Sequence, residues 1–371
     1  MKLSIERAAL LRSLNHVQSV VERRNTIPIL ANVLIRAEDG VLTMATTDMD
    51  LEINESVAAK VSTPGATTAP AHTLFDIVRK LPDESDVQLT LNKEGTLMTV
   101  SAGRSNFKLS CLPTADFPEI GGGELPTGFS IPAADLRALI DRTKFAMSTE
   151  ETRYYLNGIY IHQTENDGVA VLCAVATDGH RLARFQMPLP EGASGMPGVI
   201  IPRKAIGELR KLVDEAADSI EISLSENKIR FAFDHIVLSS KLIDGTFPDY
   251  QKVIPQKNDK VVEVDPKVFT GAIDRVSTIS DGKSRAVKIT LHGKTMTLSA
   301  SSPDAGSATE EVEVNGDTDI EIGFNAKYLL DITSQIEGEG CRLMLADASS
   351  STIIQDNSDP SALYVLMPLR V

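Results

Sequence analysis

The sequence lacks tryptophan altogether, and only 5% of its 371 residues are aromatic. Its three cysteines, Cys111, Cys173 and Cys341, lie far apart in apolar, strand-like runs and form no CxxC pair. An odd and sparse set of cysteines argues against a disulfide framework and against a structural zinc site. We therefore expect three reduced thiols buried in the core.

Long apolar runs and targeting signals are absent as well. No stretch of about 18 apolar residues occurs, so no transmembrane helix is predicted. The first residues, MKLSIERAALLRSL, do not show the charged region, apolar region and cleavage site of a secretory signal. The expectation is a cytoplasmic protein with no membrane partner.

Positive charge is scarce, since 37 Lys and Arg residues face 51 Asp and Glu residues, for a net charge of −14. Averaged over the chain, this argues against a nucleic-acid-binding protein. The six segments with helical periodicity nevertheless carry a net +7, and the remaining residues −21. These segments are 6–24, 70–81, 133–144, 202–213, 265–276 and 325–336. On a shared face they would suit weak, non-specific contact with phosphates; alternatively, Lys and Arg simply favour solvated helices.

Several sequence patterns recur along the chain. A short alternating strand followed by a helix start occurs in LSIERAALLRSL (3–14), FSIPAADLRALI (129–140) and VEVDPKVFTGAI (262–273). A second helical pattern occurs in PAHTLFDIVRKL (70–81), PRKAIGELRKLV (202–213) and NAKYLLDITSQI (325–336). A third occurs twice, in LSCLPTADFPEI (109–120) and SSKLIDGTFPDY (239–250). The patterns follow one another in the same order each time they recur along the chain.

This order predicts an α+β fold built from three tandem copies of a two-helix, antiparallel-sheet domain. We expect the N-terminal domain at 1–125, the middle domain at 126–256 and the C-terminal domain at 257–371. The alternative is three unrelated α+β domains that share short patterns.

Motifs of known enzyme classes are missing from the chain, including GxGxxG before a helix, the Walker loop, HExxH and GxSxG. One candidate remains in AVATDGHRLAR (174–184), where Asp178 and His180 could form an acid–base pair of a hydrolase. The corresponding segments TTDMDLE (46–52) and SSPDAGS (301–307) also place Asp in a turn after a strand. Asp178 is therefore expected to be structural, whereas His180, Arg181 and Leu182 belong to the middle copy alone.

Seven segments resemble the bacterial DNA polymerase III beta sliding clamp family over the full length of the chain. They are NTIPILANVL (25–34), GRSNFKLS (103–110), RYYLNGIYI (153–161), ATDGHRLA (176–183), KLIDGTFPDYQKVIP (241–255), EIGFNAKYLLD (321–331) and YVLMPLRV (364–371). The resemblance implies a DNA clamp fold that closes as a head-to-tail homodimeric ring with its helices inside. It also implies a non-catalytic processivity factor for DNA replication that encircles duplex DNA, with no cofactor, metal or catalytic residue.

The resemblance further implies partners and a binding pocket. The partners are the DNA polymerase III alpha subunit, the clamp loader complex, and other polymerases and repair proteins, met in the cytoplasm at the nucleoid. Their short hydrophobic peptides would bind between the middle and C-terminal domains. A deep apolar subsite is expected from Leu156, Thr177, Gly179, His180, Arg181, Leu182, Pro248 and Val253. A neighbouring subsite is expected from Asn325, Tyr328, Ser351, Val365, Met367, Pro368, Leu369 and Arg370. Lys252, Ser349 and Leu369 depart from the usual residues of the family, so peptide preference is left open.

Contacts to DNA and to a second subunit follow from the same resemblance. The DNA contacts are Arg24, Tyr154, Tyr155, Arg203 and Lys204, with His72 left open because the family often has arginine there. Core packing is the alternative for the tyrosines. The dimer contacts are Arg104, Phe107 and Leu109 at one end, and Ile279, Glu310, Glu311 and Glu313 at the other.

Two interpretations remain beside the clamp: the hydrolase, and a three-domain scaffold that binds proteins but no DNA. The last segment, YVLMPLRV, is expected to be a final strand whose terminal residues are free to line a groove.

Overall fold

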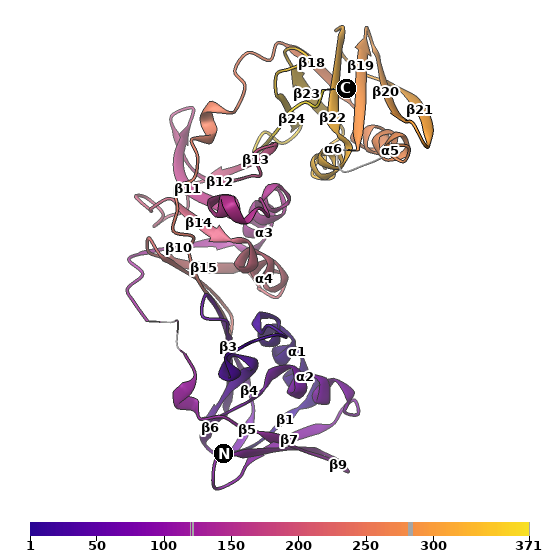
Figure 1. Cartoon of the computed structure of the whole chain (residues 1–371). Helices are drawn as coiled ribbons and strands as arrows, with labels where there is room; N and C mark the ends of the chain where they lie inside the picture. The colour runs from indigo at the N-terminus through magenta and orange to yellow at the C-terminus, as the bar shows by residue number, and fades with distance from the viewer. Residues whose placement is uncertain (119, 121, 281–284, 371) are drawn as a thin grey trace. The chain divides into compact units, whose positions relative to one another are not determined.

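The computed structural model describes every residue except 119, 121, 281–284 and 371. The chain folds into two compact units (Figure 1). The first unit comprises residues 1–136, 190–194 and 204–242, and the second comprises residues 137–189, 195–203 and 243–371. The sheets are antiparallel, as the sequence predicts, and each unit contains two of them.

The first unit contains a five-stranded sheet in the order β5-β1-β7-β8-β9 and an eight-stranded sheet in the order β10-β15-β16-β17-β4-β3-β2-β6. The strands of the smaller sheet are β1 (Lys2–Glu6), β5 (Lys60–Thr63), β7 (Asp86–Leu91), β8 (Leu97–Ala102) and β9 (Ser105–Ser110). Those of the larger sheet are β2 (Asn32–Glu38), β3 (Val41–Thr47), β4 (Leu51–Ala58), β6 (Gly65–Pro70), β10 (Thr127–Pro132), β15 (Ser219–Leu224), β16 (Lys228–Phe233) and β17 (Ile236–Lys241).

The second unit repeats this plan with an eight-stranded sheet, β14-β11-β12-β13-β25-β24-β23-β18, and a four-stranded sheet, β21-β20-β19-β22. The strands of the larger sheet are β11 (Gly158–Asn166), β12 (Val169–Thr177), β13 (Arg181–Pro188), β14 (Val199–Pro202), β18 (Lys260–Val264), β23 (Cys341–Leu345), β24 (Thr352–Asp356) and β25 (Ala362–Leu366). Those of the smaller sheet are β19 (Ala286–His292), β20 (Thr295–Ser302), β21 (Gly306–Glu313) and β22 (Ile320–Asn325).

Both large sheets join strands from neighbouring sequence repeats. Strand β4 of the first repeat pairs with β17 of the second, from Leu51 opposite Ser240 to Glu55 opposite Ile236. Strand β13 of the second repeat pairs with β25 of the third, with Leu182 opposite Val365. Consecutive repeats therefore share a hydrogen-bonded sheet, which is why the compact units do not coincide with single repeats.

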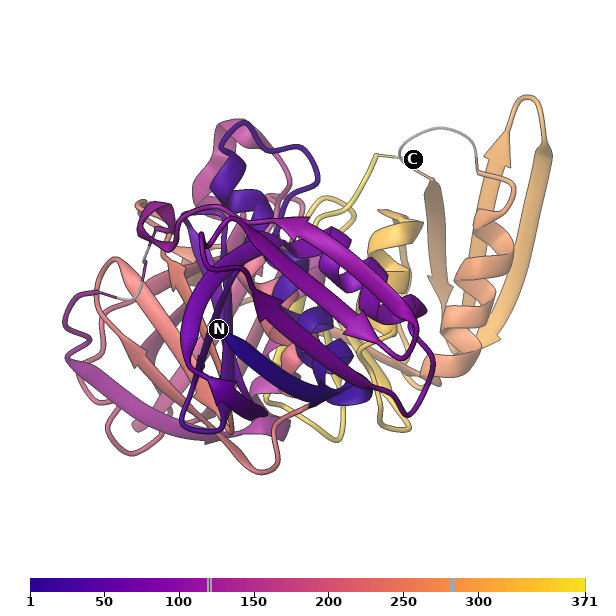
Figure 2. The same cartoon turned by 90° about the horizontal axis from the view of Figure 1, so that it is seen from below.

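All six expected helices are present. They are α1 (Arg7–Val17), α2 (Ala71–Lys80), α3 (Ala133–Asp141), α4 (Arg203–Val213), α5 (Pro266–Ser277) and α6 (Ala326–Thr333). α1 and α2 lie side by side in the first unit, and Figure 2 shows α5 lying along β20 and β21 in the second. Apolar side chains such as Leu10, Leu74 and Phe269 are fully buried beneath the helices.

The expected helix 6–24 is wrong at its C-terminal end. α1 stops at Val17 and continues as a single 3₁₀ turn, η1 (Gln18–Val20), before the chain becomes extended at Val21. Such tightening of the last turn is common. Arg24 consequently lies on an exposed loop beyond the helix.

The structure also tests two further expectations: three buried, reduced thiols and no transmembrane helix. All three thiols are free, but Cys111 follows β9 and is only half-buried, whereas Cys173 and Cys341 are buried. Among the described residues, no helix is long and apolar enough to cross a membrane.

Candidate functional site

The turn between β12 and β13 contains the candidate pair Asp178 and His180. The Asp178 Oδ1 atom accepts hydrogen bonds from the backbone N–H groups of His180 at 2.9 Å and Arg181 at 3.0 Å. Its Oδ2 atom accepts another from Arg181 Nε at 3.1 Å. A carboxylate whose oxygens are taken up by three donors in a tight turn serves the structure of that turn. The geometry does not support the hydrolase interpretation.

The turn between β3 and β4 repeats this arrangement. Asp48 Oδ1 accepts from the N–H groups of Asp50 at 2.9 Å and Leu51 at 2.7 Å. In both turns a threonine hydroxyl, on Thr47 or Thr177, donates to a main-chain carbonyl four residues later. The turn is thus part of the repeat, as the sequence comparison predicts for Asp178.

The third copy differs from that expectation. Ser302 Oγ accepts from the N–H groups of Asp304 at 3.3 Å and Ala305 at 3.4 Å, and the Thr47 and Thr177 hydroxyls likewise accept from the N–H group two residues later. Pro303 therefore occupies the aspartate position, and Asp304 is displaced by one residue. Asp304 is not the structural equivalent of Asp178.

Arg181 extends from the same turn into the interior of the second unit, where only 8% of it is exposed. Its guanidinium donates to Asp331 Oδ2 at 2.5 Å and to the Phe145 carbonyl at 2.6 Å. The Tyr328 ring covers it at 4.3 Å from the ring centroid. The guanidinium is therefore already bound by protein groups on several sides.

A pocket of about 230 Å³ opens beside this turn. It is lined by ten residues that the sequence places in the peptide site: Leu156, Thr177, Gly179, His180, Arg181, Leu182, Pro248, Val253, Val365 and Met367. Three further lining residues are Arg153, Tyr155 and Tyr250. Arg153 and Tyr155 belong to the RYYLNG segment and Tyr250 to FPDY. Arg153 and Tyr250 were not among the predicted site residues, and Tyr155 was predicted as a DNA contact and not as part of the peptide site.

Six expected residues lie outside this lining. They are Asn325, Tyr328, Ser351, Pro368, Leu369 and Arg370. Asn325 caps α6 by accepting from the N–H groups of Lys327 and Tyr328. The Leu369 N–H donates to the Gly323 carbonyl at 2.7 Å. The Leu369 backbone is thereby attached to β22, whereas Met367 of the same terminal segment lines the pocket.

The pocket surface is mostly apolar. Leu156, Leu182 and Val365 are buried in its floor, while Val253 and Met367 are exposed at its edge. Apolar walls with a few polar groups, here His180 and Arg153, are typical of sites that bind part of a ligand in a concave surface. Methionine adds adaptability because its side chain is flexible.

The first unit provides an internal comparison for this pocket. By strand register, Glu52 opposite Ser239 corresponds to Leu182 opposite Val365. Glu52 accepts from the Ile120 N–H at 3.2 Å, and the neighbouring Asp50 forms an ion pair with Lys241 at 3.0 Å. Polar, paired side chains thus replace the apolar floor, so the apolar pocket is a property of the second unit and is not imposed by the repeat.

The residues expected to contact DNA have different surroundings. Lys204 Nζ binds two carboxylates, Glu22 at 3.1 Å and Asp48, which offset its charge. Arg203 donates to the Met147 and Ser148 carbonyls at 3.2 and 3.3 Å, while Arg24 is exposed.

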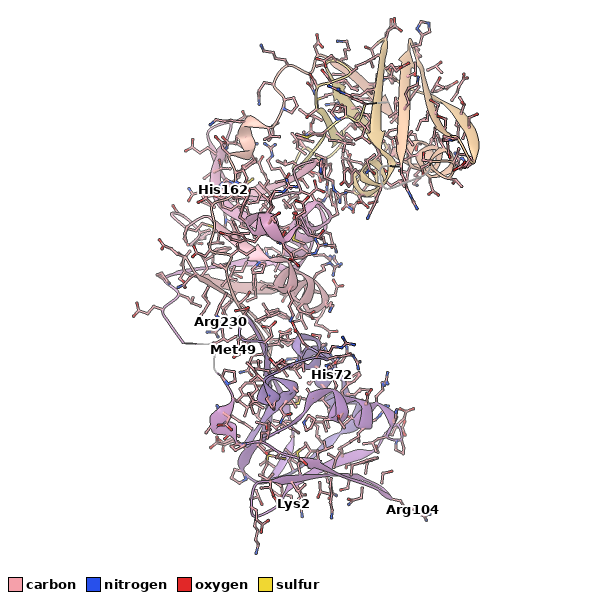
Figure 3. The ribbon with its side chains drawn as sticks, viewed as in Figure 1. Lys2, Met49, His72, Arg104, His162 and Arg230 are labelled. Atoms are coloured by element: carbon pink, nitrogen blue, oxygen red, sulfur yellow. The ribbon has the colours of Figure 1, made fainter. Side chains whose placement is uncertain are left out.

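Two aromatic residues and a histidine complete this group. Tyr154 is 52% exposed, so core packing is the wrong alternative for it. Tyr155 is half-buried and lines the pocket. His72, labelled in Figure 3, has its Nε2 atom 2.9 Å from the Val21 carbonyl.

The residues expected at the dimer contact occupy two sheet edges. Arg104 lies in the hairpin turn before the edge strand β9 (Figure 3), and Phe107 is exposed on that strand, whereas Leu109 is buried. Glu310, Glu311 and Glu313 lie on β21, the edge of the four-stranded sheet, and Ile279 follows α5. Glu310 is already paired with Arg275 at 2.6 Å.

Within the described part of the chain, no group of three or more His, Cys, Asp or Glu side chains is arranged to hold a metal ion.

Three family models match successive parts of the chain. They describe the N-terminal, central and C-terminal domains of the DNA polymerase III beta subunit, and they match residues 1–121, 130–249 and 251–370. Together they extend over nearly the whole sequence.

Curated relatives and solved structures agree with these matches. The chain is 52% identical to a beta sliding clamp from Caulobacter vibrioides and 38% identical to one from Escherichia coli, each over 100% of both chains. A C. crescentus beta sliding clamp structure has a TM-score of 0.98 at 52% identity, covering 100% of this chain and 99% of that one. A Bartonella birtlesii sliding clamp bound to griselimycin has a TM-score of 0.97 at 49% identity, covering 100% of both. The chain therefore belongs to the DNA polymerase III beta subunit family, that of the beta sliding clamps.

Proposed function

We propose that the chain, a non-catalytic sliding clamp, encircles duplex DNA and holds the replicative polymerase there through short hydrophobic peptides bound in the pocket of the second unit. The observation that carries the peptide-binding part is the apolar pocket of about 230 Å³. Apolar side chains of a partner would be removed from water there, which is favourable by about 25 cal/mol per Å² of buried surface. Leu156, Leu182 and Val365 supply that apolar floor.

The partners are proposed from the family. They are the DNA polymerase III alpha subunit, the clamp loader complex, and other polymerases and repair proteins with similar peptides. The six expected residues outside the lining are proposed to support or extend the site. Tyr328 and Asn325 support it by fixing Arg181 and α6. The cytoplasm is the proposed location.

Ring closure is proposed from two free sheet edges. Strands β9 and β21 each end a sheet, so one side of each has no strand partner among the residues that the structure describes and offers its backbone N–H and C=O groups for pairing. Pairing β9 of one copy with β21 of another would satisfy those groups. A head-to-tail contact of this kind forms a closed ring when the rotation between copies is suitable. The acidic side chains of β21 suit a basic partner, and Arg104 and Lys108 lie on or beside β9.

Contact with DNA is proposed to be weak and independent of sequence. Arg24 and Tyr154 are the preferred contacts because both are exposed, whereas Arg203 donates to two carbonyls and Lys204 is bound to two carboxylates. A protein linked topologically to DNA needs little affinity, and contacts made only to phosphates are screened by salt and permit sliding. The proposed domain limits remain 1–125, 126–256 and 257–371, and the family matches to 1–121, 130–249 and 251–370 support them.

A single loading experiment tests both parts of the proposal. The clamp is loaded by a matching clamp loader onto nicked circular DNA, and retention and processive synthesis are measured. Wild-type clamp should stay on the circle, leave after the DNA is linearised, and support long products. Val253→Asp places a charge at the apolar pocket edge, where Val253 is 43% exposed. This variant should be loaded less well and should give short products, because the loader and the polymerase are proposed to use the same pocket.

The matched control is Val169→Asp. Val169 is an exposed valine of the same unit and is not one of the residues that line the pocket. It should behave like the wild type. A clamp that binds the polymerase but is not retained on circles would favour the protein-binding scaffold. A Val253→Asp clamp with full processivity would contradict the pocket assignment.

A further inference from the structure

An aromatic column lies behind one wall of the pocket. The Tyr160 ring stacks on Phe247, with centroids 4.8 Å apart and planes at 10°, and on His162, at 4.6 Å and 20°. Tyr160 and His162 are two residues apart on β11, so their side chains share one face of the sheet. Tyr250 lies edge-on to His162 at 5.7 Å. His162 is labelled in Figure 3.

The hydrogen bonds of this column have a defined direction. The His162 Nδ1 atom lies 2.9 Å from the Gln163 carbonyl, which can only accept, so Nδ1 carries the proton. The Nε2 atom is then an acceptor, and the Tyr250 hydroxyl donates to it at 3.0 Å. The Cys173 thiol, 3.4 Å from the Tyr250 oxygen, can then donate to that hydroxyl.

Burial keeps this chain of groups neutral. It lowers the pKa of the His162 imidazole, and it raises the pKa of both the Cys173 thiol and the Tyr250 hydroxyl. Arg184 is the charged group that acts on Cys173 and Tyr250. A neutral imidazole is the form that can accept the Tyr250 hydroxyl bond.

Tyr250 connects the column to the pocket. Its ring is part of the pocket lining, and it begins the 3₁₀ turn η6 (Tyr250–Lys252). The Val253 N–H donates to the Tyr250 carbonyl at 3.0 Å. Pro248 and Val253, on either side of Tyr250, also line the pocket. The hydroxyl bond to His162 therefore holds the residue at the centre of this wall, residues 248–253.

The first repeat lacks the column, which shows that the fold does not require it. By strand register, Leu34 and Arg36 occupy the positions of Tyr160 and His162, and Thr43 that of Cys173. A hollow of about 220 Å³ remains there beside Phe117, the counterpart of Phe247. The aromatic column is thus an addition to the common fold, and it occurs in the second repeat. The turn between β12 and β13 of that repeat and its FPDY segment (247–250) contribute to the pocket.

We propose that His162 is a positioning residue for the peptide pocket: it accepts the Tyr250 hydroxyl bond and so holds wall 248–253 in the shape that receives a peptide. This inference rests on the proposed peptide-binding function. His162 itself does not line the pocket, so it acts through Tyr250.

The test measures binding of a fluorescein-labelled tail peptide of the polymerase III alpha subunit to the full-length clamp by anisotropy. Tyr250→Phe removes the hydroxyl that donates to His162 and contacts Cys173, and His162→Phe removes the acceptor but retains an aromatic ring for stacking. Each should raise the Kd about fivefold, the effect of one hydrogen bond. The double variant should be no weaker than either single one, because both remove the same bond. His162→Gln retains an acceptor and should restore much of the affinity.

The control is His292→Phe, at an exposed histidine on β19 outside the pocket lining. It should bind like the wild type, and thermal unfolding confirms that each variant is folded at the assay temperature. Unchanged affinity in both single variants, or losses that add in the double variant, would overturn the positioning role. A wild-type clamp that fails to bind the peptide would instead overturn the proposed function.

Discussion

The guanidinium of Arg181 joins the turn before β13 to helix α6. It forms ion pairs with Asp178 and Asp331 and lies against the Tyr328 ring. A buried charge is stabilised only while its partners remain, and removal of one partner from a buried pair costs about 3–5 kcal/mol. Arg181 therefore stabilises the pocket from behind, and its loss should affect folding as well as binding.

We expect Arg181→Met to lower the free energy of unfolding by about 3 kcal/mol, since it leaves the carboxylates of Asp178 and Asp331 unpaired. Arg181→Lys should recover only part of this loss, because an ammonium group lacks the planar fork that reaches several acceptors. Urea denaturation measures both. The matched control is Arg230→Met at an exposed arginine on β16, which should change stability by less than about 0.5 kcal/mol. Equal values for the two methionine variants would contradict this assignment.

The role of a residue in its local turn could be predicted from the sequence better than its contacts with residues distant in the sequence. The repeat comparison gave Asp178 a structural role, and its hydrogen bonds to His180 and Arg181 agree. Sequence does not reveal that Arg181 points inward to Asp331, because that contact joins residues 150 positions apart. Tyr250 was overlooked for a similar reason: it lines the pocket and bonds His162, a residue 88 positions away in the sequence.

At the scale of elements, helix starts illustrate how local chemistry fixes structure. α5 and α6 begin with side-chain caps: Asp265 accepts from the N–H groups of Lys267 and Val268, and Asn325 from those of Lys327 and Tyr328. α1 begins after Glu6, whose side chain makes no such bond. The caps satisfy donors that have no partner inside the helix.

Asn325→Ala should lower the free energy of unfolding by about 1 kcal/mol through loss of the α6 cap. Glu6→Ala, at a helix start without a side-chain cap, is the control and should have a smaller effect. Because Tyr328 covers Arg181, Asn325→Ala should also weaken binding of the alpha-subunit tail peptide. Calorimetry and anisotropy provide the two measurements, and a variant as stable as wild type would exclude a role for the cap.

The periodicity of apolar residues predicted which segments are helices and which are strands, but it did not predict where some of these elements end. The 3.6-residue pattern continues past Val17, yet the chain leaves the α-helix there for the 3₁₀ turn η1. The end of β25 shows the same limit, because nothing local indicates that Leu369 pairs with Gly323. Such ends depend on partners distant in sequence.

For the whole molecule, the repeats were visible in sequence, whereas the pairing between them was not. Three copies follow from recurring strand and helix patterns, but the patterns do not specify that β4 pairs with β17 or β13 with β25. Those pairings unite edge strands of neighbouring copies. The same physical requirement, that free backbone groups at a sheet edge find partners, applies to β9 and β21 and links the fold to assembly.

Phe107 provides the test of assembly because it is an exposed aromatic residue, at 38%, on the edge strand β9. Pairing of β9 with β21 of a second copy would bury this ring beside the backbone of the new strand, and large aromatic residues dominate interface energies. We expect sedimentation to show a wild-type dimer at micromolar concentration and a Phe107→Asp monomer, since the added carboxylate would face the acidic β21. Val41→Asp, at a valine with 39% exposure on β3, should remain dimeric. A dimeric Phe107→Asp variant, or a monomeric wild type, would rule out closure through these edges; a monomeric Phe107→Asp should also be lost from nicked circular DNA that retains Val41→Asp.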